Sequence, residues 1–352
     1  MVDFQLTEEQ ESMREMAHDF AEKEIRPVAW EYDKEGTWPE VIIKKAWRLG
    51  LMNSHLPAQY GGVGASYLDG CLIGEELAWG CAAIGTTLGA NELGSAPVLL
   101  GGSNEIKTKY LGRLTEEPKL ASFCLTEPDA GSDVSGMRTT AVKKGNKYVI
   151  NGSKCFITNG GYADWYTVYA KTDKDAGHRG ISAFVVPKDE TVTVEKHEDK
   201  MGLRASNTAT ISFNDTEVPL GNLLGEENHG FKLAMMTLDR TRPGVASMAT
   251  GIARAAFEFA TEYSKERVQF GVPIAMHQAI QFMLADMATN IEAARLLVWQ
   301  SPVLLDQGKR NTLASAHAKR FAADMGMQVT TDAVQVYGGY GFMKEYPTRS
   351  RS

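Results

Sequence analysis

The chain has 352 residues, 43% hydrophobic and 23% charged, a composition typical of a globular protein with two or three packed units. Its formal net charge of −7 argues against nucleic acid or an anionic lipid surface as a partner, because both require a basic surface. The four cysteines contain no C-x-x-C pair, so they indicate neither a zinc site nor a disulfide framework and are expected to be reduced, mostly buried thiols: Cys71, Cys81, Cys124 and Cys155.

No stretch approaches the ~20 consecutive apolar residues that a membrane-spanning helix needs. The first residues, MVDFQLTEEQ, lack the basic and then apolar pattern of a secretory signal. We therefore expect no membrane span. The expected location is the cytoplasm, or the mitochondrial matrix after removal of a transit peptide.

Residues 1–119 are predicted to be helical. Thr7 and Gln10 have the spacing of a capping box, and a stripe of apolar residues at spacings of three and four follows them. Pro27 is expected to end this first helix. Two further helices are predicted over Pro39 to Leu49 and Tyr67 to Trp79.

Residues 120–227 change in character to short β-branched and aromatic segments separated by Gly, Asn, Asp and Pro, which predicts a β domain. Helical periodicity returns over residues 228–352. One apolar stripe there is strong enough to predict a helix bundle: Ile280, Met283, Leu284, Met287, Ile291 and Ala294. Pro302 is expected to kink or end that helix. The predicted fold class is thus α+β, and helical layers around a β domain suggest a cofactor held between them.

Two segments of the β domain combine strand and loop chemistry. FCLTEPDAGSD, residues 123–133, is a strand running into a loop whose hydroxyls and backbone donors could bind a planar heterocycle and a pyrophosphate. KCFITNGG, residues 154–161, places Phe156 and Thr158 on the same strand face. The alternative is that both segments are ordinary core strands with incidental turn residues, and the pattern alone favours neither interpretation.

The chain resembles the acyl-CoA dehydrogenases, and their medium-chain branch most closely. The resemblance runs from about Phe4 to Pro347 and is carried by LTEPDAGSD, ITNGGYADWY, ERVQFGVPI, HQAIQFMLADM and DAVQVYGGYGFMKEYP, in this order. It implies an N-terminal helical domain, a middle β-barrel-like domain and a C-terminal helical bundle. It also implies FAD as cofactor, oxidation of a medium-chain acyl-CoA to the trans-2,3-enoyl-CoA in fatty-acid β-oxidation, a homotetramer, and electron-transferring flavoprotein as the electron acceptor.

The resemblance implies a flavin site that two subunits share. One part matches the loop and strand beside the flavin: Phe123, Leu125, Thr126, Ser132, Phe156, Ile157 and Thr158. The other part matches segments that in the family reach the FAD of a neighbouring subunit: Arg267, Gln269, Phe270, His277, Gln278, Gln335, Gly338 and Gly339. Glycines in the last segment would let the backbone approach the pyrophosphate closely.

For the acyl-CoA itself, the resemblance implies contacts from Ser132, Asp239, Thr241, Arg242, Arg310 and Thr312. From spacing alone, Asp239 and Arg242 are more readily interpreted as a surface ion pair three residues apart on a helix. The acyl tail would enter a pocket lined by AAIGTTLGANELG, residues 82–94. Gly85 and Gly89 stand there in place of larger polar residues, so we expect a pocket at least as deep as a medium chain requires.

The sequence differs from the family pattern at the catalytic base. In the family it is usually a Glu in a Y-E-G-T motif beyond the Y-G-G-Y-G-F stretch, and this sequence contains no Y-E-G-T. Some relatives supply the base from the position of Thr241 instead, but a threonine cannot act as a base near neutral pH. We therefore expect a chain truncated in its C-terminal bundle, lacking the last helices, and nearly inactive. A carboxylate elsewhere beside the substrate, for instance Glu345, would overturn this expectation.

Two alternatives remain open. The chain could be an acyl-CoA-binding flavoprotein without dehydrogenase activity, or an enzyme that performs desulfination or another elimination. Neither is excluded by the sequence.

Overall fold

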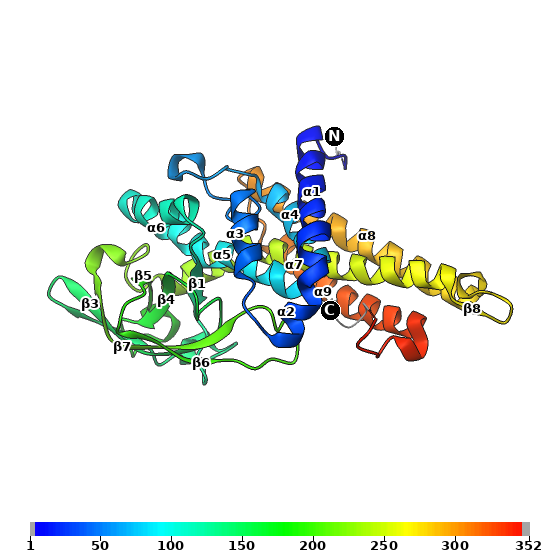
Figure 1. Cartoon of the computed structure of the whole chain (residues 1–352). Helices are drawn as coiled ribbons and strands as arrows, with labels where there is room; N and C mark the ends of the chain where they lie inside the picture. Colours follow the sequence, from blue (N-terminus) through cyan, green and yellow to red (C-terminus); the bar gives the residue numbers. More distant parts are fainter. Residues whose placement is uncertain (1–3, 347–352) are drawn as a thin grey trace.

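The computed structural model describes residues 4–346 and contains a β-sheet that follows one set of helices and precedes another (Figure 1). The first part is helical: α1 (Glu8–Phe20), a π-helical turn (Ala21–Ile25), α2 (Arg26–Glu35), α3 (Glu40–Arg48), a 3-10 turn (Ala58–Tyr60), α4 (Tyr67–Gly80), α5 (Ala82–Gly101) and α6 (Asn104–Glu116). The predicted second and third helices are therefore confirmed. All four cysteines are buried thiols that form no disulfide, as expected.

The capping box at the start of α1 is confirmed. The Thr7 hydroxyl accepts a hydrogen bond from the Gln10 backbone N–H (3.2 Å), and the Gln10 side chain accepts one from the Thr7 N–H (3.1 Å). The prediction that Pro27 ends the helix is wrong, because the chain passes through the π-helical turn and continues as α2. Pro27 lies in the first turn of α2, where a backbone N–H needs no helical partner.

The middle part is a sheet of seven strands: β1 (Ala121–Cys124), β2 (Thr140–Lys144), β3 (Lys147–Thr158), β4 (Trp165–Lys171), β5 (Ile181–Pro187), β6 (Val192–His197) and β7 (Thr208–Pro219). The strand order is β1-β4-β2-β3-β7-β6, and β5 pairs with β4. The sheet curls, because the chain beside β1 also lies against the end of β3: Cys155 N–H donates to the Thr126 carbonyl (3.0 Å), and Ser122 Oγ donates to the Thr158 carbonyl (2.8 Å).

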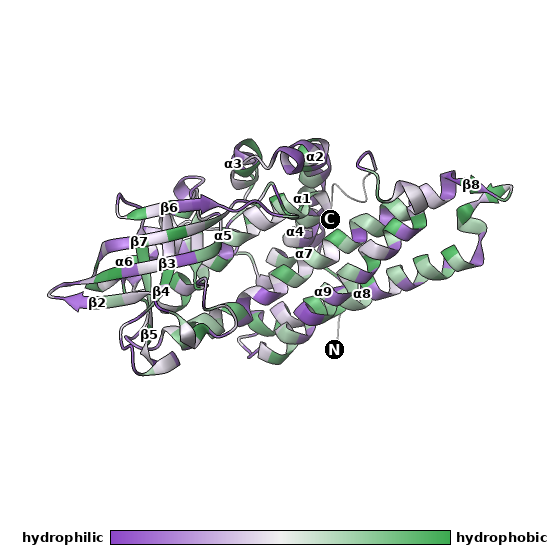
Figure 2. Ribbon diagram, turned by 90° about the horizontal axis from the view of Figure 1, so that it is seen from below, coloured by the Kyte–Doolittle hydropathy of each residue, from purple (hydrophilic) through white to green (hydrophobic). Residues whose placement is uncertain are grey.

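The last part is a bundle of three long helices: α7 (Gly230–Glu266), α8 (Gln278–Asp306) and α9 (Thr312–Tyr337). A short hairpin, β8 (Val268–Gln269) with β9 (Val272–Pro273), joins α7 to α8 at the end remote from the sheet (Figures 1 and 2). Of the predicted stripe, Met287, Ile291 and Ala294 are fully buried between the helices. The expected early end at Pro302 is wrong, because α8 continues to Asp306 with Pro302 buried inside it.

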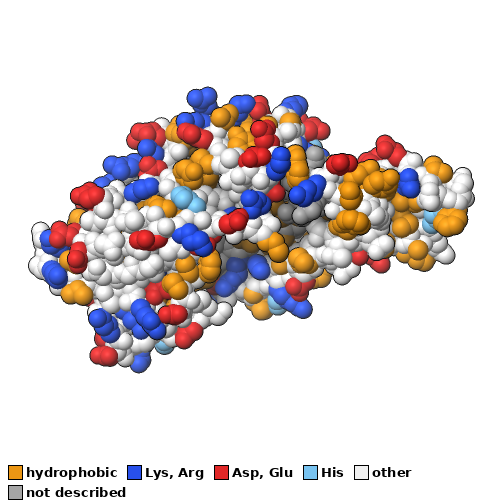
Figure 3. Space-filling view, turned by 60° about the horizontal axis from the view of Figure 1, so that its bottom comes forward, with side chains coloured by type: hydrophobic (Ala, Val, Ile, Leu, Met, Phe, Trp, Pro, Cys, Tyr) orange, Lys and Arg blue, Asp and Glu red, His pale blue; other side chains and the backbone are white. Residues whose placement is uncertain are grey.

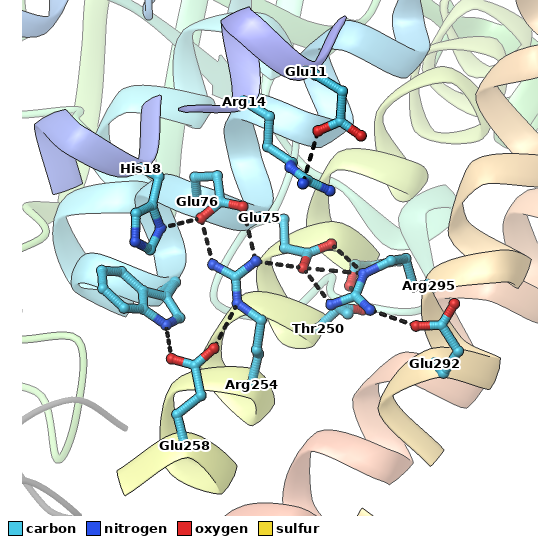
Figure 4. Close-up of polar contacts among 12 residues, drawn as sticks. Glu11, Arg14, His18, Glu75, Glu76, Thr250, Arg254, Glu258, Glu292 and Arg295 are labelled. Atoms are coloured by element: carbon cyan, nitrogen blue, oxygen red, sulfur yellow. Dashed lines mark hydrogen bonds and ion pairs between the residues drawn. The ribbon is translucent and has the colours of Figure 1, made fainter. Parts of the chain in front are cut away.

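A buried ion-pair cluster joins these helical layers (Figure 4). Glu75 and Glu76 of α4 face Arg254 of α7, which binds both carboxylates, and Arg295 of α8 pairs with Glu75 at 2.8 Å. His18 of α1 contacts Glu76 at 2.8 Å. Burial alone raises the pKa of Glu76, but the hydrogen bonds and charges of Arg254 and His18 outweigh burial and lower it. Because each buried carboxylate has a cationic partner, the cluster fixes α1, α7 and α8 around α4.

Within residues 4–346, no helix combines the length and apolar character required to cross a membrane.

Candidate functional site

A cavity of about 350 Å³ lies where α4, α5 and α7 meet the end of the sheet. Its walls come from α4 (Gly70, Ile73, Gly74, Leu77), α5 (Gly85, Thr86, Leu88, Gly89, Ala90, Glu92, Leu93), α7 (Thr241, Gly244, Val245, Met248) and the segment before α4 (Leu51, Asn53, Ser54, His55), with Thr158 and Leu203 from the β part. Most of the wall is apolar, which suits the hydrocarbon part of a ligand. The segment predicted to line an acyl pocket does line this cavity.

The two glycines that prompted the expected depth have different roles. A Cβ at Gly85 would lie 3.1 Å from the backbone of Ala78, so glycine there allows α5 to pack closely on α4. At Gly89 a Cβ would meet only the Met248 sulfur, at 3.8 Å, so this position has room for a side chain. Gly89 is therefore the glycine that leaves space in the cavity.

Glu92 and His55 are the ionisable residues of the cavity wall within the described chain, and neither was predicted as a site residue. Burial raises the pKa of Glu92 to about 7. Burial, and then the charge of Arg240, lowers the pKa of His55 to about 3, so its ring is neutral at pH 7. His55 Nε2 lies 3.0 Å from Ser95 Oγ. Glu92 lies inside the segment predicted to line the pocket. Its position in the cavity wall opposite α7 is visible only in the structure.

The residues predicted to flank a flavin on this chain come together at the end of β3. Phe156, Ile157 and Thr158 lie against the chain that leaves β1, which carries Phe123, Leu125 and Thr126. Phe156 sits at a register shift with φ of 59°, and 68% of its surface is exposed. A bulky residue in the left-handed region is strained and must be held by its surroundings. Thr158, two residues after Phe156 on β3, lines the cavity, whereas Ser132 is exposed on the loop after β1.

A buried ion pair holds the loop after β1. Lys154 on β3 is fully buried and donates to Glu127 (2.7 Å) and to the Leu125 carbonyl (3.0 Å). Glu127 also accepts the backbone N–H groups of Arg138 and Thr139. Burial raises the pKa of Glu127, but Lys154 and these donors outweigh burial and lower it. The loop is thus fixed at both ends against the strand that carries Phe156.

The predicted acyl-CoA contacts on the helices also cluster. Asp239 forms an ion pair with Arg242 and accepts the Thr312 hydroxyl at 2.6 Å, and Arg310 Nε donates to the same Thr312 oxygen at 3.0 Å. The ion pair expected as the plainer interpretation exists, but it is part of this larger cluster. Thr241 lies two residues further along α7, buried in the cavity wall.

Pro243 explains how the cluster residues of α7 come to lie against those at the start of α9. Pro243 lies inside α7 and has no N–H, so the Asp239 carbonyl has no donor in its own helix. Asn311, the residue before α9, donates to that carbonyl at 2.9 Å and to Ser301 Oγ at 3.1 Å. The gap left by Pro243 therefore docks the start of α9, with Arg310 and Thr312, on α7.

The residues predicted to contact a neighbouring subunit's flavin lie at the remote end of the bundle. A second cavity of about 530 Å³ there is lined by Arg267, Gln269, Gly338 and Gly339, together with Tyr263 and Tyr340. His277 Nε2 lies 3.2 Å from the Gln269 carbonyl, and the His277 ring contacts Phe270. Gln335, near the end of α9, and Gln278, at the start of α8, are exposed beside this group. The structure brings these residues together at the far end of α7 from the first cavity, which Thr158 lines, and the β8 hairpin lies away from the sheet (Figures 1 and 2).

This remote end has features of a contact surface. Gly338 has φ of 59° and ψ of −134°, a conformation that residues with a Cβ strongly disfavour, and the space where a Cβ would lie is open. Phe270 at the hairpin tip is 94% exposed. Val268, Met276 and Phe282, close to it in the chain, are exposed apolar side chains as well. Figure 3 shows apolar side chains in orange on this end of the molecule. An apolar patch of this kind is typical of a protein–protein interface.

Neither Thr241 nor Glu345 places a carboxylate in the first cavity. The Thr241 hydroxyl donates to the Thr237 carbonyl at 3.1 Å. Glu345 is exposed beyond α9, next to Tyr346 at the remote end, and does not line the first cavity. The residues after 346, on which the expected truncation rested, lie outside the described part of the chain.

Comparison with protein families gives three consecutive matches. The acyl-CoA dehydrogenase N-terminal, middle and C-terminal domains match residues 7–118, 122–216 and 228–351. Because the last match runs to residue 351, the expectation of a truncated C-terminal domain finds no support, and neither does the near-inactivity inferred from it.

Individual relatives agree. An acyl-CoA dehydrogenase of Bacillus subtilis (strain 168) is 48% identical, the alignment covering 97% of this chain and 91% of that protein. The butyryl-CoA dehydrogenase structure from Megasphaera elsdenii superposes with a TM-score of 0.97 at 46% identity, covering 99% of this chain and 93% of that one. A solved structure described as the electron transferring flavoprotein of Acidaminococcus fermentans gives a TM-score of 0.97 at 49% identity, with the same coverage.

Proposed function

Because this chain belongs to the acyl-CoA dehydrogenase family, we propose that it holds an acyl-CoA thioester against FAD and oxidises the acyl chain to the trans-2,3-enoyl form. The observation that carries the proposal is the position of Thr158. It ends the strand segment that exposes Phe156, and it also lines the apolar cavity. A ring placed beside Phe156 would therefore lie at the entrance to the space that suits an acyl chain.

The residues present fit a flavin nucleotide in two parts. The exposed ring of Phe156 and the anchored loop with Thr126 and Ser132 offer an apolar face with nearby hydrogen-bonding groups. The open backbone at Gly338 and Gly339, with Arg267, suits a pyrophosphate. Since these parts lie far apart on one chain, each complete site requires a second copy. We therefore propose a homo-oligomer, with the tetramer of the family as the expected form.

Bound FAD supplies the acceptor for the hydride that leaves the β-carbon. This chain's own contribution is to bind and orient the thioester. Asp239, Arg242, Arg310 and Thr312 form the polar cluster proposed for the pantetheine and nucleotide, while the cavity keeps water from the acyl carbons. Electron-transferring flavoprotein is the proposed acceptor of the electrons, and the cytoplasm or mitochondrial matrix the proposed location.

The cavity volume bears on acyl length. About 350 Å³ is near the lower end of the ~300–1,000 Å³ range of small-molecule sites. The expected medium-chain preference receives no support from the relatives, one of which is a butyryl-CoA dehydrogenase. We propose straight-chain substrates of short to medium length, to be ranked by affinity across the series from butyryl-CoA to octanoyl-CoA.

The test is an anaerobic titration of the FAD-loaded protein with this series. Loss of the flavin absorption band shows oxidation of the thioester, and an unchanged band with no evidence of binding by calorimetry contradicts the proposal. Binding without loss of the band supports the second candidate, an acyl-CoA-binding flavoprotein. The observation that favours this second candidate is Thr241, whose hydroxyl cannot serve as a base.

A pair of variants separates the two candidates further. Thr241→Glu places a carboxylate in the cavity wall, and Thr241→Gln is the matched control of the same size without charge. If the wild type only binds thioesters, Thr241→Glu should restore flavin reduction by at least tenfold over Thr241→Gln. If the wild type already has its base, both variants should reduce the rate.

A further inference from the structure

Glu92 places a carboxylate in the wall of the first cavity. Its backbone carbonyl accepts the Ser95 hydroxyl (3.3 Å), but no described residue donates to its carboxylate or forms an ion pair with it. A Cβ placed on Gly244 of the facing helix α7 would lie 3.7 Å from Glu92 Oε2. The carboxylate thus points across the cavity toward a position where α7 presents no side chain.

An unpaired polar group in an apolar cavity costs free energy until it finds a hydrogen-bond partner. Burial raises the pKa of Glu92 to about 7, so near neutral pH its protonated and ionised forms are both populated. The group can then donate a hydrogen bond in one form and accept one in the other. A hydroxyl satisfies both forms, because it can accept and donate.

The surroundings distinguish a hydroxyl from charged alternatives. An ammonium group on the ligand can donate but not accept, so it would leave the protonated form of Glu92 without an acceptor. A carboxylate on the ligand would face the ionised form of Glu92 and be repelled by it. The pKa of Cys71, a buried thiol, is raised chiefly by burial, and the charge of Glu92 contributes to the same shift.

We propose that the preferred acyl-CoA carries a hydroxyl group on its acyl chain, and that this hydroxyl forms a hydrogen bond with Glu92 across from Gly244. The inference deepens the proposed function, on which it rests, by naming the chemical class of the substrate. Glu92 is a specificity-determining residue: it contacts the chain beyond the carbons that react, and the thioester is held by other residues.

The experiment measures dissociation constants by calorimetry for the FAD-loaded protein. The probes are hexanoyl-CoA and ω-hydroxyhexanoyl-CoA, repeated with the butyryl and octanoyl pairs. In at least one of the three pairs, wild type is expected to bind the hydroxylated thioester about tenfold more tightly than the plain thioester. The reason is that one hydrogen bond of this kind contributes about 1–1.5 kcal/mol. Glutaryl-CoA, which ends in a carboxylate, should bind more weakly than the plain thioester of similar length.

Variants assign this preference to the carboxyl group. Glu92→Leu should reverse it in favour of the plain chain, whereas Glu92→Gln, which can still donate and accept, should retain it. Glu116→Leu, an exposed position at the end of α6, is the matched control and should behave as wild type. Melting temperature and FAD content, measured for every variant, show that each remains folded.

Two outcomes overturn the inference. The first is equal binding of plain and hydroxylated chains by wild type, and the second is a preference that Glu92→Leu leaves unchanged. If no thioester of any kind binds, the proposed function fails as well, so the two failures are distinguishable.

Discussion

At Gly89 the cavity wall is backbone alone, and a side chain introduced there should set the length of acyl chain that fits. We predict that Gly89→Leu weakens octanoyl-CoA binding by about tenfold or more, because displacing two methylenes costs about 0.8 kcal/mol each. Butyryl-CoA should bind as in wild type. Calorimetry checks both ligands, with Gly112→Leu as control, since the Cβ position of Gly112 on α6 has no neighbour within 4 Å. Equal losses for the two ligands would contradict this role.

Glu92 should also make stability depend on pH. Its pKa rises from 4.5 to about 7 on folding, so the folded chain binds this proton more tightly than the unfolded chain. The free energy of unfolding therefore falls as pH increases from about 4.5 through about 7, by at most about 3 kcal/mol. Glu92→Gln has no carboxyl group to ionise at this position, so its free energy of unfolding does not fall for this reason. Its melting temperature should therefore exceed that of wild type more at about pH 8 than at about pH 5.

The comparison with wild type isolates Glu92 from His55. The lowered pKa of His55 makes the unfolded chain the tighter proton binder below pH 6.5, which is the opposite sign. His55 is present in both proteins, so its effect cancels in the difference. A difference in melting temperature that does not change with pH would show that Glu92 keeps its ordinary pKa.

Sequence patterns identified residues whose chemistry is local. The Thr7 capping box could be predicted, because it depends on a residue three positions away. The expected common strand face of Phe156 and Thr158 stays a prediction, because a register shift with positive φ at Phe156 interrupts the alternation of β3. Glu92 could not be recognised, because its isolation depends on Gly244 of α7, more than a hundred residues away in the sequence.

Among the elements, β3 should depend strongly on its buried ion pair. Lys154→Met leaves the Glu127 carboxylate buried without its cation, and breaking such a pair costs about 3–5 kcal/mol. Lys147→Met, on the same strand, removes an exposed pair with Glu217 (2.6 Å) and should cost no more than about 1 kcal/mol. Chemical denaturation measures both variants. FAD content should fall in Lys154→Met alone, because the loop after β1 loses its anchor.

The contact of α9 with α7 can be tested by a double-mutant cycle. Asn311→Ala leaves the Asp239 carbonyl without a donor and should cost about 1–3 kcal/mol. In Pro243→Ala the helix regains an N–H for that carbonyl, so adding Asn311→Ala should then cost less. A coupling energy of about 1 kcal/mol is expected from denaturation of the four proteins. Additive effects would show that Pro243 does not provide the docking point.

Proline was the weak point of the element predictions. Existence and type of the main helices were predictable from periodicity, but Pro27 and Pro302 were each expected to interrupt a helix, and both lie inside continuing helical chain. Pro27 occupies a first turn, and Pro302 is buried among the bundle helices. Tertiary packing that compensates a missing hydrogen bond is not visible in a local pattern.

For the whole molecule, the prediction concerns assembly. Phe270→Asp places a charge on the exposed tip of the β8–β9 hairpin, where we propose contact with a second copy. It should shift the oligomer toward smaller species in light scattering and lower FAD content several-fold, because each flavin site would lose half its residues. Val63→Asp, an exposed position in the loop before α4, is the control. Unchanged assembly together with unchanged FAD content would contradict a shared site at this hairpin.

The three-part architecture was predictable from changes in composition along the chain, and the resemblance supplied the two groups of flavin residues. Neither showed that the two groups lie far apart on one chain, because their separation depends on the length and direction of α7. That helix also contributes Thr241, Gly244 and Met248 to the first cavity and ends at Arg267, beside the second.

With 37 residues, α7 is a continuous rod of about 55 Å. Inserting or deleting one residue between Met248 and Arg267 would rotate the tip by about 100° relative to the cavity wall and shift it by about 1.5 Å. Phe270 and Arg267 would then face a different direction, although every residue at both ends is unchanged. The outer side chains of this stretch are free to vary, but its number of residues is not.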